Sequence, residues 1–326
     1  MKILVTGGLG FIGHGVVAQL ESLGHEVVVV DNCNSYGILS PQELDPLMSE
    51  RRQHFRTHRV FDYDIQDQAG MTWVYRHYLP EVVVHLASFP RQKVVNANPQ
   101  LGSQTMSEGL LNLLELNARY DVRKFVYVSS SMVYGNFKDT YVDGVDESHD
   151  CSPLGQYGIM KLAGEWLVED YARRTGMEYT VLRPSAVYGP RDVEDRVVSK
   201  FFLAAMRGGI IQVNGEHESL DFTYVSDAVK GVVDATISDR TDKQIYNITR
   251  GSARSLLEAA ELVVSIVGQG TIQVNPADGN FPSRGQLNIT KARKDFGFNP
   301  MIDIEQGFAD YYEWLTNSIY WTKKTV

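Results

Sequence analysis

The chain has 326 residues and a formal net charge of −9, with 43% hydrophobic and 22% charged residues, the composition of an ordinary globular protein. The negative charge disfavours a nucleic-acid partner. No apolar run is long enough to span a membrane, and the chain begins directly in an apolar segment without a leader, so we expect a cytoplasmic protein with no membrane partner. The two cysteines, Cys33 and Cys151, form neither a disulfide framework nor a zinc-ligand spacing, and we expect no metal site.

The first thirteen residues predict a strand, a tight turn and the start of a helix. Gly7, Gly10 and Gly13 follow a short apolar run with the spacing G-x-x-G-x-x-G. Glycines at this spacing let the backbone turn sharply and approach a pyrophosphate at a helix N-terminus. A second apolar run, Val27–Val30, ends in Asp31, at the place where an acidic residue holds the adenosine ribose. Because a carboxylate repels a 2′-phosphate, the sequence favours NAD over NADP.

Four short apolar runs, around Val5 and at 27–30, 82–84 and 125–128, are separated by helix-compatible segments. Continuous apolar runs are typical of buried parallel strands, so the pattern predicts an α/β, doubly wound Rossmann sheet. Residues 32–59 contain no comparable run and are predicted to form a surface excursion with one short helix.

The segment 81–88 predicts a further strand and its exit into the ligand cleft, since ligands of open α/β sheets bind beyond the strand carboxyl ends. Leu86, Ala87 and Ser88 are therefore expected beside the cofactor phosphates, and His85 is expected to be structural. Arg91 follows on a loop facing the cleft, either as a phosphate or sugar contact or as a solvated charge.

A second motif combines a strand end with a helix start. The strand 124–128 ends in three serines, and Tyr157 and Lys161 open a helix predicted to run to about Arg174. Positions i and i+4 share one helix face, so the phenol and the ammonium point the same way. The ammonium and a nicotinamide ring lower the pKa of the phenol, which can then exchange a proton near neutral pH.

These motifs together resemble the extended short-chain dehydrogenase/reductases, in particular the sugar-nucleotide epimerase and dehydratase branch typified by UDP-galactose 4-epimerase. The likeness covers essentially the whole chain. It rests on the segments 6–13, 31–32, 64–65, 85–87, 129–135, 182–184, 187–190 and 221–225, on Asp227, and on Tyr157 with Lys161.

The resemblance implies catalytic roles for three residues. Tyr157 removes the proton of the sugar 4-hydroxyl while C4 gives a hydride to NAD, Lys161 holds the cofactor ribose, and Ser130 hydrogen-bonds the 4-oxygen. The resemblance assigns NAD to Gly7, Gly10, Phe11, Ile12, Gly13, Asp31, Asn32, Asn34, Ser35, Asp64, Ile65, Leu86, Ala87, Ser88, Tyr157, Lys161, Pro184 and Ser185. Of these, Asp64 is either an adenine contact or a helix N-cap.

The two residues after Ser130 bear on the reaction. Dehydratases of the branch carry an acidic pair there, and decarboxylases keep a glutamate, whereas this chain has Ser131 and Met132. Because methionine cannot move a proton, C5–C6 elimination and decarboxylation lose their expected acid/base group. The function that the sequence favours is 4-epimerisation of a nucleoside-diphosphate sugar. The second alternative is net oxidation or 4-keto reduction at C4, and the third is a non-catalytic NAD sensor.

Three departures concern the substrate. Ala186, Leu220 and Met106 stand where the family has an asparagine, an arginine and an asparagine, so two diphosphate contacts are missing. Arginine suits phosphate oxygens, so arginines are the expected replacements. The candidate substrate-binding residues are Arg91, Ser130, Ser131, Met132, Tyr157, Arg191, Arg196, Val197, Gln212, Asn214 and Arg284.

The expected division is a NAD-binding domain at 1–185 and a smaller α/β substrate-binding domain at 186–326, some segments of which return to the first. The helix 109–119, rich in leucine, is expected to pack in the core. The resemblance implies a homodimer formed through the helices 109–119 and 157–174.

Overall fold

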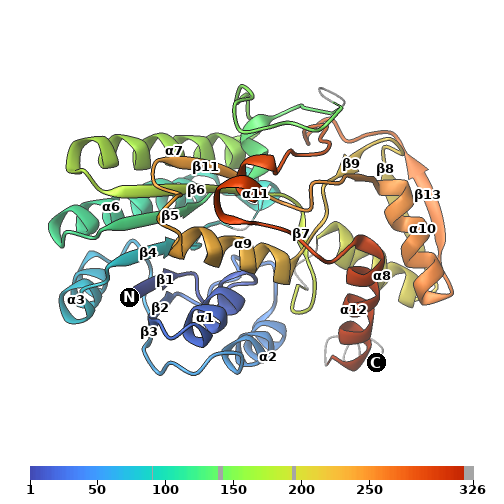
Figure 1. Cartoon of the computed structure of the whole chain (residues 1–326). Helices are drawn as coiled ribbons and strands as arrows, with labels where there is room; N and C mark the ends of the chain where they lie inside the picture. The colour runs from blue at the N-terminus through green and yellow to red at the C-terminus, as the bar shows by residue number, and fades with distance from the viewer. Residues whose placement is uncertain (90, 139–141, 193–195, 319–326) are drawn as a thin grey trace.

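The computed structural model describes residues 1–89, 91–138, 142–192 and 196–318. Its centre is a seven-stranded parallel sheet with the strand order β11-β6-β5-β4-β1-β2-β3 (Figure 1). The order reverses between β1 and β4, which is the feature of a doubly wound sheet that opens a ligand crevice at the strand carboxyl ends. The predicted fold class is confirmed.

The strands of this sheet are β1 Lys2–Thr6, β2 Glu26–Asp31, β3 Val60–Asp62, β4 Val82–His85, β5 Lys124–Val128, β6 Glu178–Pro184 and β11 Gln244–Ile248. The helices that connect them are α1 Gly13–Ser22, α2 Pro41–Arg52, α3 Gln68–Tyr78, α4 Gln92–Ala97, α5 Pro99–Ser103, the π-helix η1 Gln104–Glu108, α6 Gly109–Arg119, the 3₁₀ turn η2 Ser131–Tyr134, α7 Gln156–Thr175 and α9 Val225–Ile237.

Helices cover both faces of the sheet, and each face has its own core. One core joins alternate strand residues such as Val5 and Val29 to α1 and α9, and the other joins Leu4 and Val28 to α3, α6 and α7. Because both faces are buried, the strands need no polar alternation, which explains the continuous valine runs. The predicted core helix 109–119 is confirmed as α6.

The excursion between β2 and β3 contains a single helix, α2, as predicted. Ser40 and Glu43 form a capping box at its start, and Pro41 occupies its first turn. Its last turn carries Glu50, Arg51 and Arg52. Arg51 of this turn lines a ligand cavity described below, whereas the sequence predicts only a surface segment here.

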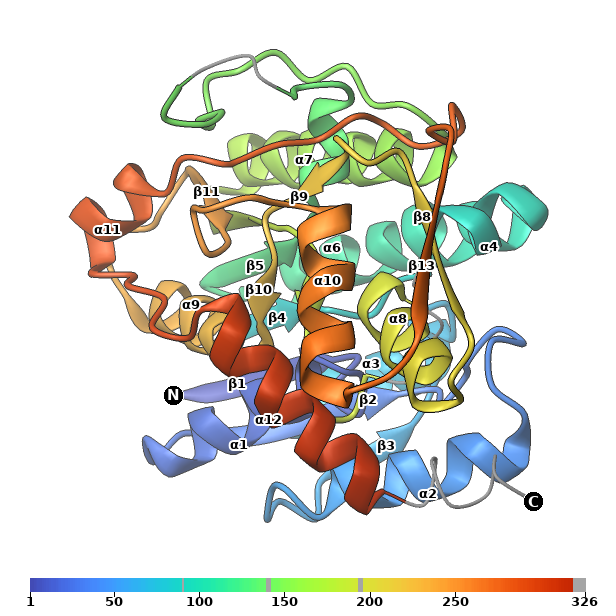
Figure 2. The same ribbon diagram turned by 90° about the vertical axis from the view of Figure 1, so that its right-hand side faces the viewer.

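A second cluster lies beyond the strand carboxyl ends, on the right of Figure 1 and facing the viewer in Figure 2. It contains α8 Val197–Met206, α10 Leu256–Val267, α12 Ile304–Asn317 and the parallel pair β8 Ile210–Asn214 and β13 Thr271–Asn275, around one hydrophobic core. The remaining short elements are β7 Val187–Tyr188, β9 Ser219–Leu220, β10 Thr223–Tyr224, β12 Arg254–Ser255 and α11 Thr290–Phe296.

The chain crosses between the two parts more than once. After the first pass through the outer cluster, α9 packs on α1 and β11 joins the edge of the main sheet beside β6. In the described ranges, no helix combines the length and apolar character needed to cross a membrane.

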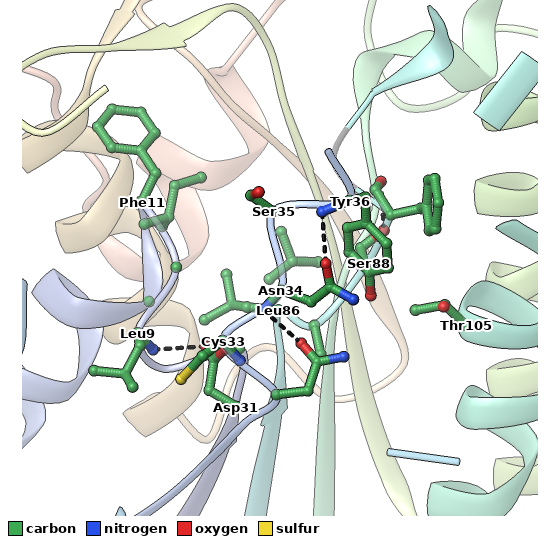
Figure 3. Close-up of a pocket in the computed structure, with 18 of the residues that line it drawn as sticks. Leu9, Phe11, Asp31, Cys33, Asn34, Ser35, Tyr36, Leu86, Ser88 and Thr105 are labelled. Carbon is green, nitrogen blue, oxygen red and sulfur yellow. Dashed lines mark hydrogen bonds between the residues drawn. The ribbon is translucent and has the colours of Figure 1, made fainter. Parts of the chain in front are cut away.

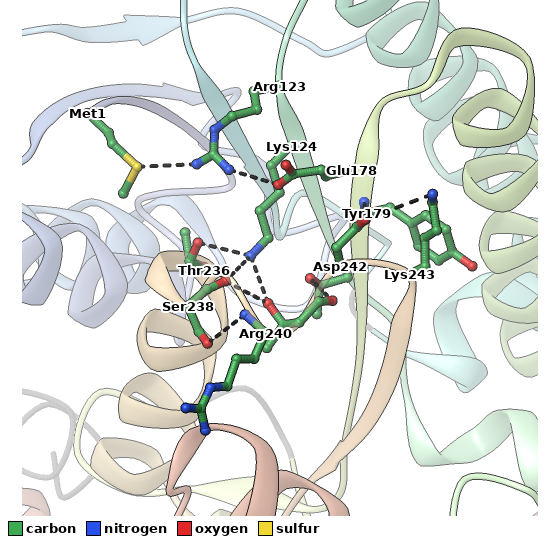
Figure 4. Close-up of polar contacts among 12 residues, drawn as sticks. Met1, Arg123, Lys124, Glu178, Tyr179, Thr236, Ser238, Arg240, Asp242 and Lys243 are labelled. Atoms are coloured by element: carbon green, nitrogen blue, oxygen red, sulfur yellow. Dashed lines mark hydrogen bonds and ion pairs between the residues drawn. The ribbon is translucent and has the colours of Figure 1, made fainter.

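A buried lysine joins β5 to the end of α9. The Lys124 side chain is 1% exposed, and its ammonium donates to the carbonyl oxygens of Ala235, Thr236 and Ser238 at 2.9, 3.2 and 2.9 Å and to the Thr241 hydroxyl at 2.7 Å (Figure 4). A helix C-terminus presents carbonyls without intrahelical donors, and a cation there satisfies them. Burial lowers the pKa of Lys124 to about 8, so the ammonium form still predominates at neutral pH.

Lys124→Met is expected to lower the free energy of unfolding by about 2–4 kcal/mol, because it leaves several buried oxygens without their donor. Denaturant unfolding measures the change. Lys243→Met is the control, since that nearby side chain is 64% exposed and its ion pair with Asp242 is long, at 3.9 Å. Equal stability of the two variants would contradict a structural role for the Lys124 ammonium.

Candidate active site

Two adjoining cavities open at the carboxyl end of the sheet. The first, the turn cavity, is lined by the glycine-rich turn, the residues after β2 and β4, and the start of α7. The second, the outer cavity, has a volume of about 960 Å³ and lies between η2, α4, α8 and the segment 277–284. The residues that line both are Tyr36, Ile38, Ser130, Tyr157, Ala186, Val187 and Arg196. The predicted catalytic pair, Ser130 and Tyr157, therefore stands at the boundary between the cavities.

The glycine turn is built so that no side chain fits inside it. Gly7 has φ 73°, and the Gly10 N–H donates to its carbonyl at 3.0 Å. A Cβ on Gly13 would lie 2.0 Å from the Gly7 oxygen, and one on Gly7 would lie 2.6 Å from the Ala87 nitrogen. The α1 N-cap, Ile12, supplies no side-chain cap, so the helix presents its first N–H groups toward the turn cavity.

Asp31 fixes this turn from the end of β2. Its carboxylate accepts the Leu9 N–H and the Cys33 N–H, both at 2.9 Å (Figure 3). Burial raises the pKa of Asp31, and the two backbone hydrogen bonds oppose the rise. Asp31 lines the turn cavity as expected, and it also orders the backbone on both sides.

The segment after Asp31 folds by side-chain caps of its own. The Asn32 side-chain oxygen Oδ1 accepts the Asn34 N–H at 3.2 Å, and the Asn34 Oδ1 accepts the Tyr36 N–H at 2.7 Å (Figure 3). Asn residues favour such local turns. Asn32, Asn34 and Ser35 thereby line the turn cavity, and Tyr36 joins them from a left-handed conformation, φ 52°.

Asp64 does not line the turn cavity, but it holds the segment 32–36 in place through a hydrogen bond with Asn32. It accepts the Asn32 amide at 2.8 Å and the Gln66 N–H at 2.9 Å. The alternative that Asp64 caps a helix is wrong, because Asp67 caps α3 by accepting from Ala69 and Gly70. Ile65, the next residue after Asp64, does line the cavity.

The ends of β4 and β6 complete the turn cavity. Leu86, Ala87, Ser88 and Pro184 line it, as do Phe11 and Ile12 of the turn. Ser185 does not; it is buried, and its hydroxyl has no hydrogen-bond partner among the described residues. His85 is 2% exposed and pairs with the Thr6 hydroxyl at 2.7 Å, and burial lowers its pKa to about 3, which fits the predicted structural role.

Lys161 lies beneath Tyr157 on α7. Its ammonium is 6.0 Å from the centroid of the Tyr157 ring and donates to the Val128 carbonyl at 2.7 Å. The side chain is 4% exposed, and burial lowers its pKa to about 7. The Ser130 hydroxyl accepts the Met132 N–H at 3.2 Å, which leaves its own proton available to a ligand.

Burial raises the pKa of Tyr157, whereas the charge of Arg196 and hydrogen bonding with Ser130 lower it. The sequence analysis named the Lys161 ammonium as the neighbouring charge that lowers this pKa. In the structure that charge is Arg196, because its guanidinium reaches the boundary between the cavities from the N-cap of α8.

Most predicted substrate residues line the outer cavity, namely Arg91, Ser130, Ser131, Met132, Tyr157, Arg196, Val197, Asn214 and Arg284. Ser131 is buried, and its hydroxyl has no hydrogen-bond partner among the described residues. Burial lowers the pKa of Arg284 to about 10, and the charge of Glu218 opposes this.

Two predicted substrate residues lie outside both linings. The Arg191 side chain pairs with Glu50 of α2 at 3.1 Å, and its backbone is left-handed, with φ 72°. Gln212 lies on the exposed side of β8, where it hydrogen-bonds Gln273 and Asn275 of β13. The diphosphate contact predicted for Arg191 and the base contact predicted for Gln212 therefore gain no support from the cavity linings and stay predictions.

Arg51 is a further residue of the site that the sequence does not predict; it is 2% exposed and lines the turn cavity. Its guanidinium donates to the Arg191 carbonyl at 2.7 Å and to the Leu9 carbonyl at 3.4 Å, so it joins the glycine turn to the loop before α8. Arg191 lies 140 positions away and Leu9 lies 42 positions away, and no local pattern in the excursion marks Arg51.

The arrangement supports proton and hydride transfer at one carbon atom. Ser130 and Tyr157 line both cavities, and Lys161 lines the turn cavity alone. The cations lining the outer cavity are Arg91, Lys93, Arg196, Lys200 and Arg284, and the carboxylates are Glu218 and Asp278. This excess of cations fits a phosphorylated ligand.

Comparisons with known proteins agree with this geometry. The model of the NAD dependent epimerase/dehydratase family matches residues 3–249. The structure is similar to a Thermotoga maritima UDP-glucose 4-epimerase bound to UDP-glucose, with 30% identity, a TM-score of 0.85, and coverage of 97% of this chain and 99% of the other.

Two further solved structures are similar over nearly their whole length. A Thermus thermophilus UDP-glucose 4-epimerase in complex with NAD is 26% identical, with a TM-score of 0.85 and coverage of 98% of this chain and 100% of the other. A Bacillus cereus UDP-glucuronic acid 4-epimerase in complex with UDP-glucuronic acid and NAD is 25% identical, with a TM-score of 0.86 and coverage of 97% and 99%.

NAD is the cofactor of this chain, and the residues present fit it. A single added Cβ would fill the space inside the glycine turn. Because the glycines carry no Cβ, a pyrophosphate has room to lie against the bare backbone. Asp31 lies at the edge of the turn. Each of its carboxylate oxygens accepts one backbone N–H and can accept a further hydrogen bond from a ribose hydroxyl. When bound, NAD accepts and returns a hydride.

Proposed function

The chain belongs to the NAD-dependent epimerase/dehydratase family, and we propose that it is a 4-epimerase of a UDP-linked sugar. The observation that carries the proposal is the placement of Ser130 and Tyr157 at the boundary of the two cavities, with Met132 rather than an acid on the adjoining wall. The named activities of the three similar structures support the same reaction and the same nucleotide.

In this proposal Tyr157 takes the proton of the 4-hydroxyl and later returns one to the 4-oxygen. Ser130 donates a hydrogen bond to that oxygen, which stabilises the charge that develops there. The neighbouring Arg196 guanidinium favours the phenolate form of Tyr157, and Lys161 is proposed to hold the cofactor ribose. The hydride that leaves C4 would be accepted by NAD held at the turn cavity and returned to the opposite face of the resulting 4-keto carbon, so one turnover would cause no net change in NAD or NADH.

The wall beside Ser130 argues against elimination across C5 and C6. Met132 is 7% exposed and faces the outer cavity, and Ser131 is the other side chain presented by this turn. The described carboxylates that line this cavity are Glu218 and Asp278. Both belong to the C-terminal part, where Glu218 accepts from Ser283 and Asp278 from Asn280.

The diphosphate is proposed to lie between α8 and the segment 277–284. Arg284 and Lys200 line the outer cavity from these two sides, and Arg196 reaches it from the start of α8. These cations compensate for the neutral side chains at Ala186 and Leu220. The proposed assembly is a homodimer through α6 and α7, on whose outer face Ile159 and Trp166 are 52% and 62% exposed.

The test is incubation of the purified enzyme with UDP-glucose, UDP-galactose, UDP-glucuronic acid and other UDP-, GDP-, CDP- and dTDP-sugars. The expected result is interconversion of C4 epimers of a UDP-sugar with no accumulation of NADH. Accumulating NADH would instead indicate a C4 dehydrogenase, and entry of solvent deuterium at C5 would indicate a dehydratase. Binding of NAD without turnover of any nucleotide sugar would indicate a sensor.

A further inference from the structure

A buried carboxylate stands directly behind the predicted catalytic residues. Glu165 of α7 is 4% exposed. Arg183 of β6 binds it with two hydrogen bonds, from Nε at 3.0 Å and from Nη2 at 2.6 Å, and the Ser129 hydroxyl at the end of β5 donates to the same carboxylate. One carboxylate therefore joins two strands and the helix that carry the site.

Glu165 has a direct spatial relation to the catalytic groups. Tyr157, Lys161 and Glu165 follow one another at i, i+4 and i+8 and so lie along one face of α7. Ser129, which donates to Glu165, is bonded to Ser130. A shift of the carboxylate would move both the serine-bearing strand end and the helix face relative to one another.

The surroundings of Lys161 make Glu165 the carboxylate that acts on its ammonium. Burial disfavours the charged amine, and the charge of Glu165 is the favourable interaction opposing that cost. The other groups facing Lys161 are the Val128 carbonyl, the ring of Tyr127 at 5.2 Å, the ring of Tyr157 and the buried His85, while Arg183 lies beyond Glu165.

We propose that Glu165 is a positioning residue for the hydride-transfer site: its carboxylate fixes the Ser129–Ser130 strand end against α7 and supplies the negative charge that acts on the Lys161 ammonium. Arg183 is its partner and holds the carboxylate in a fixed orientation by bidentate contact. The inference rests on the proposed function, since Lys161 acts there together with Tyr157.

A buried Glu–Arg pair can also serve stability alone, and the experiment must separate the two roles. α7 offers a matched control in Glu169, one turn beyond Glu165, which accepts the Tyr179 hydroxyl at 2.9 Å and lines the same small cavity behind the site. Glu169 contacts neither Ser129 nor Arg183 in the hydrogen bonds of the described residues.

The first measurement needs no substrate. In holoenzyme carrying ¹³C-labelled lysine, the ε-carbon signal of Lys161 is assigned by its loss in Lys161→Met and followed against pH. The titration midpoint is expected to fall by about one pH unit in Glu165→Gln and to stay at the wild-type position in Glu169→Gln. An unchanged midpoint in Glu165→Gln would overturn the proposal.

The second measurement is the pH profile of epimerisation. Because the lowered midpoint removes the ammonium at a lower pH, the alkaline limb of kcat should move down by about one unit, with about tenfold less activity on that limb. The ratio of wild-type to variant activity should shrink as the pH falls. A deficit of the same size at every pH would indicate structural damage only and would contradict the proposal.

Two further variants address folding. Glu165→Asp keeps the charge and should restore most of the wild-type midpoint. The double variant Glu165→Gln/Arg183→Met removes the buried guanidinium that the single variant leaves unpaired, so it should fold better while keeping the lowered midpoint. A wild-type midpoint in the double variant would sink the proposal. Wild-type enzyme that turns over no nucleotide sugar would contradict the proposed function instead, and the lysine titration would still decide the role of Glu165.

Discussion

Tyr157→Phe is expected to lower kcat for epimerisation by about 10³-fold while the protein stays folded and keeps NAD. The substitution removes one oxygen atom and preserves the ring, so packing changes little. It removes the phenol oxygen of Tyr157, a residue that lines both cavities and that we propose exchanges the proton of the 4-hydroxyl. Ser130 cannot replace it, because an alkyl hydroxyl is far less acidic than a phenol.

The measurements are the rate of epimer exchange and the amount of NAD released on denaturation. Tyr171→Phe is the control: Tyr171 lies on the same helix but outside both cavities, and its hydroxyl donates to Glu115. This variant should turn over at the wild-type rate. Activity of Tyr157→Phe within tenfold of wild type, with normal NAD content, would remove Tyr157 from the role of acid/base.

The sequence predicts those parts of the site that lie at strand ends. Parallel strands end at one edge, so Gly7, Asp31, Ala87 and Ser130 come together once the sheet is known. A local pattern, an apolar run followed by a turn residue or a polar residue, predicts Gly7, Asp31, Ala87 and the serine cluster, and the family resemblance selects Ser130 within that cluster. Tyr157 and Lys161 were found in the same way, because helix periodicity fixes their shared face.

Side-chain direction in the loops could not be predicted. Arg191 and Arg196 are five positions apart and both charged, yet Arg196 reaches the cavities and Arg191 turns to Glu50. Arg191 also has a left-handed backbone, with φ 72°, a conformation that is uncommon for a non-glycine residue and that the local sequence does not predict. Gln212 and Asn214 share one side of β8, and only Asn214, at the strand end, reaches the outer cavity.

Contacts between segments that are distant in the chain also cannot be predicted from the sequence. Arg51 sits in a segment that reads as a surface excursion, and its burial results from packing against the turn and the loop before α8. The return of β11 to the main sheet has the same character, because a five-residue strand in the C-terminal half gives no sign of which sheet it joins.

Gly13→Ala is expected to abolish retention of NAD through purification and to lower the free energy of unfolding by several kcal/mol. The added Cβ would stand 2.0 Å from the Gly7 carbonyl oxygen and 2.9 Å from the Gly8 Cα. Both obstacles are backbone atoms of the turn, so no side-chain rotation relieves the clash. The turn itself must open, and its N–H groups then lose the arrangement that faces the pyrophosphate.

Gly15→Ala, on the same helix, is the matched control. Its Cβ would meet a methyl group of Val229 on α9 at 2.7 Å, an obstacle that a small shift between α1 and α9 relieves. The control should cost about 1–2 kcal/mol and keep NAD, because overpacking against a side chain leaves the turn intact. NAD content after gel filtration and denaturant unfolding measure both effects. If Gly13→Ala retains cofactor as Gly15→Ala does, the turn is not the pyrophosphate cradle, since no ligand could lie against a backbone that tolerates an atom at that place.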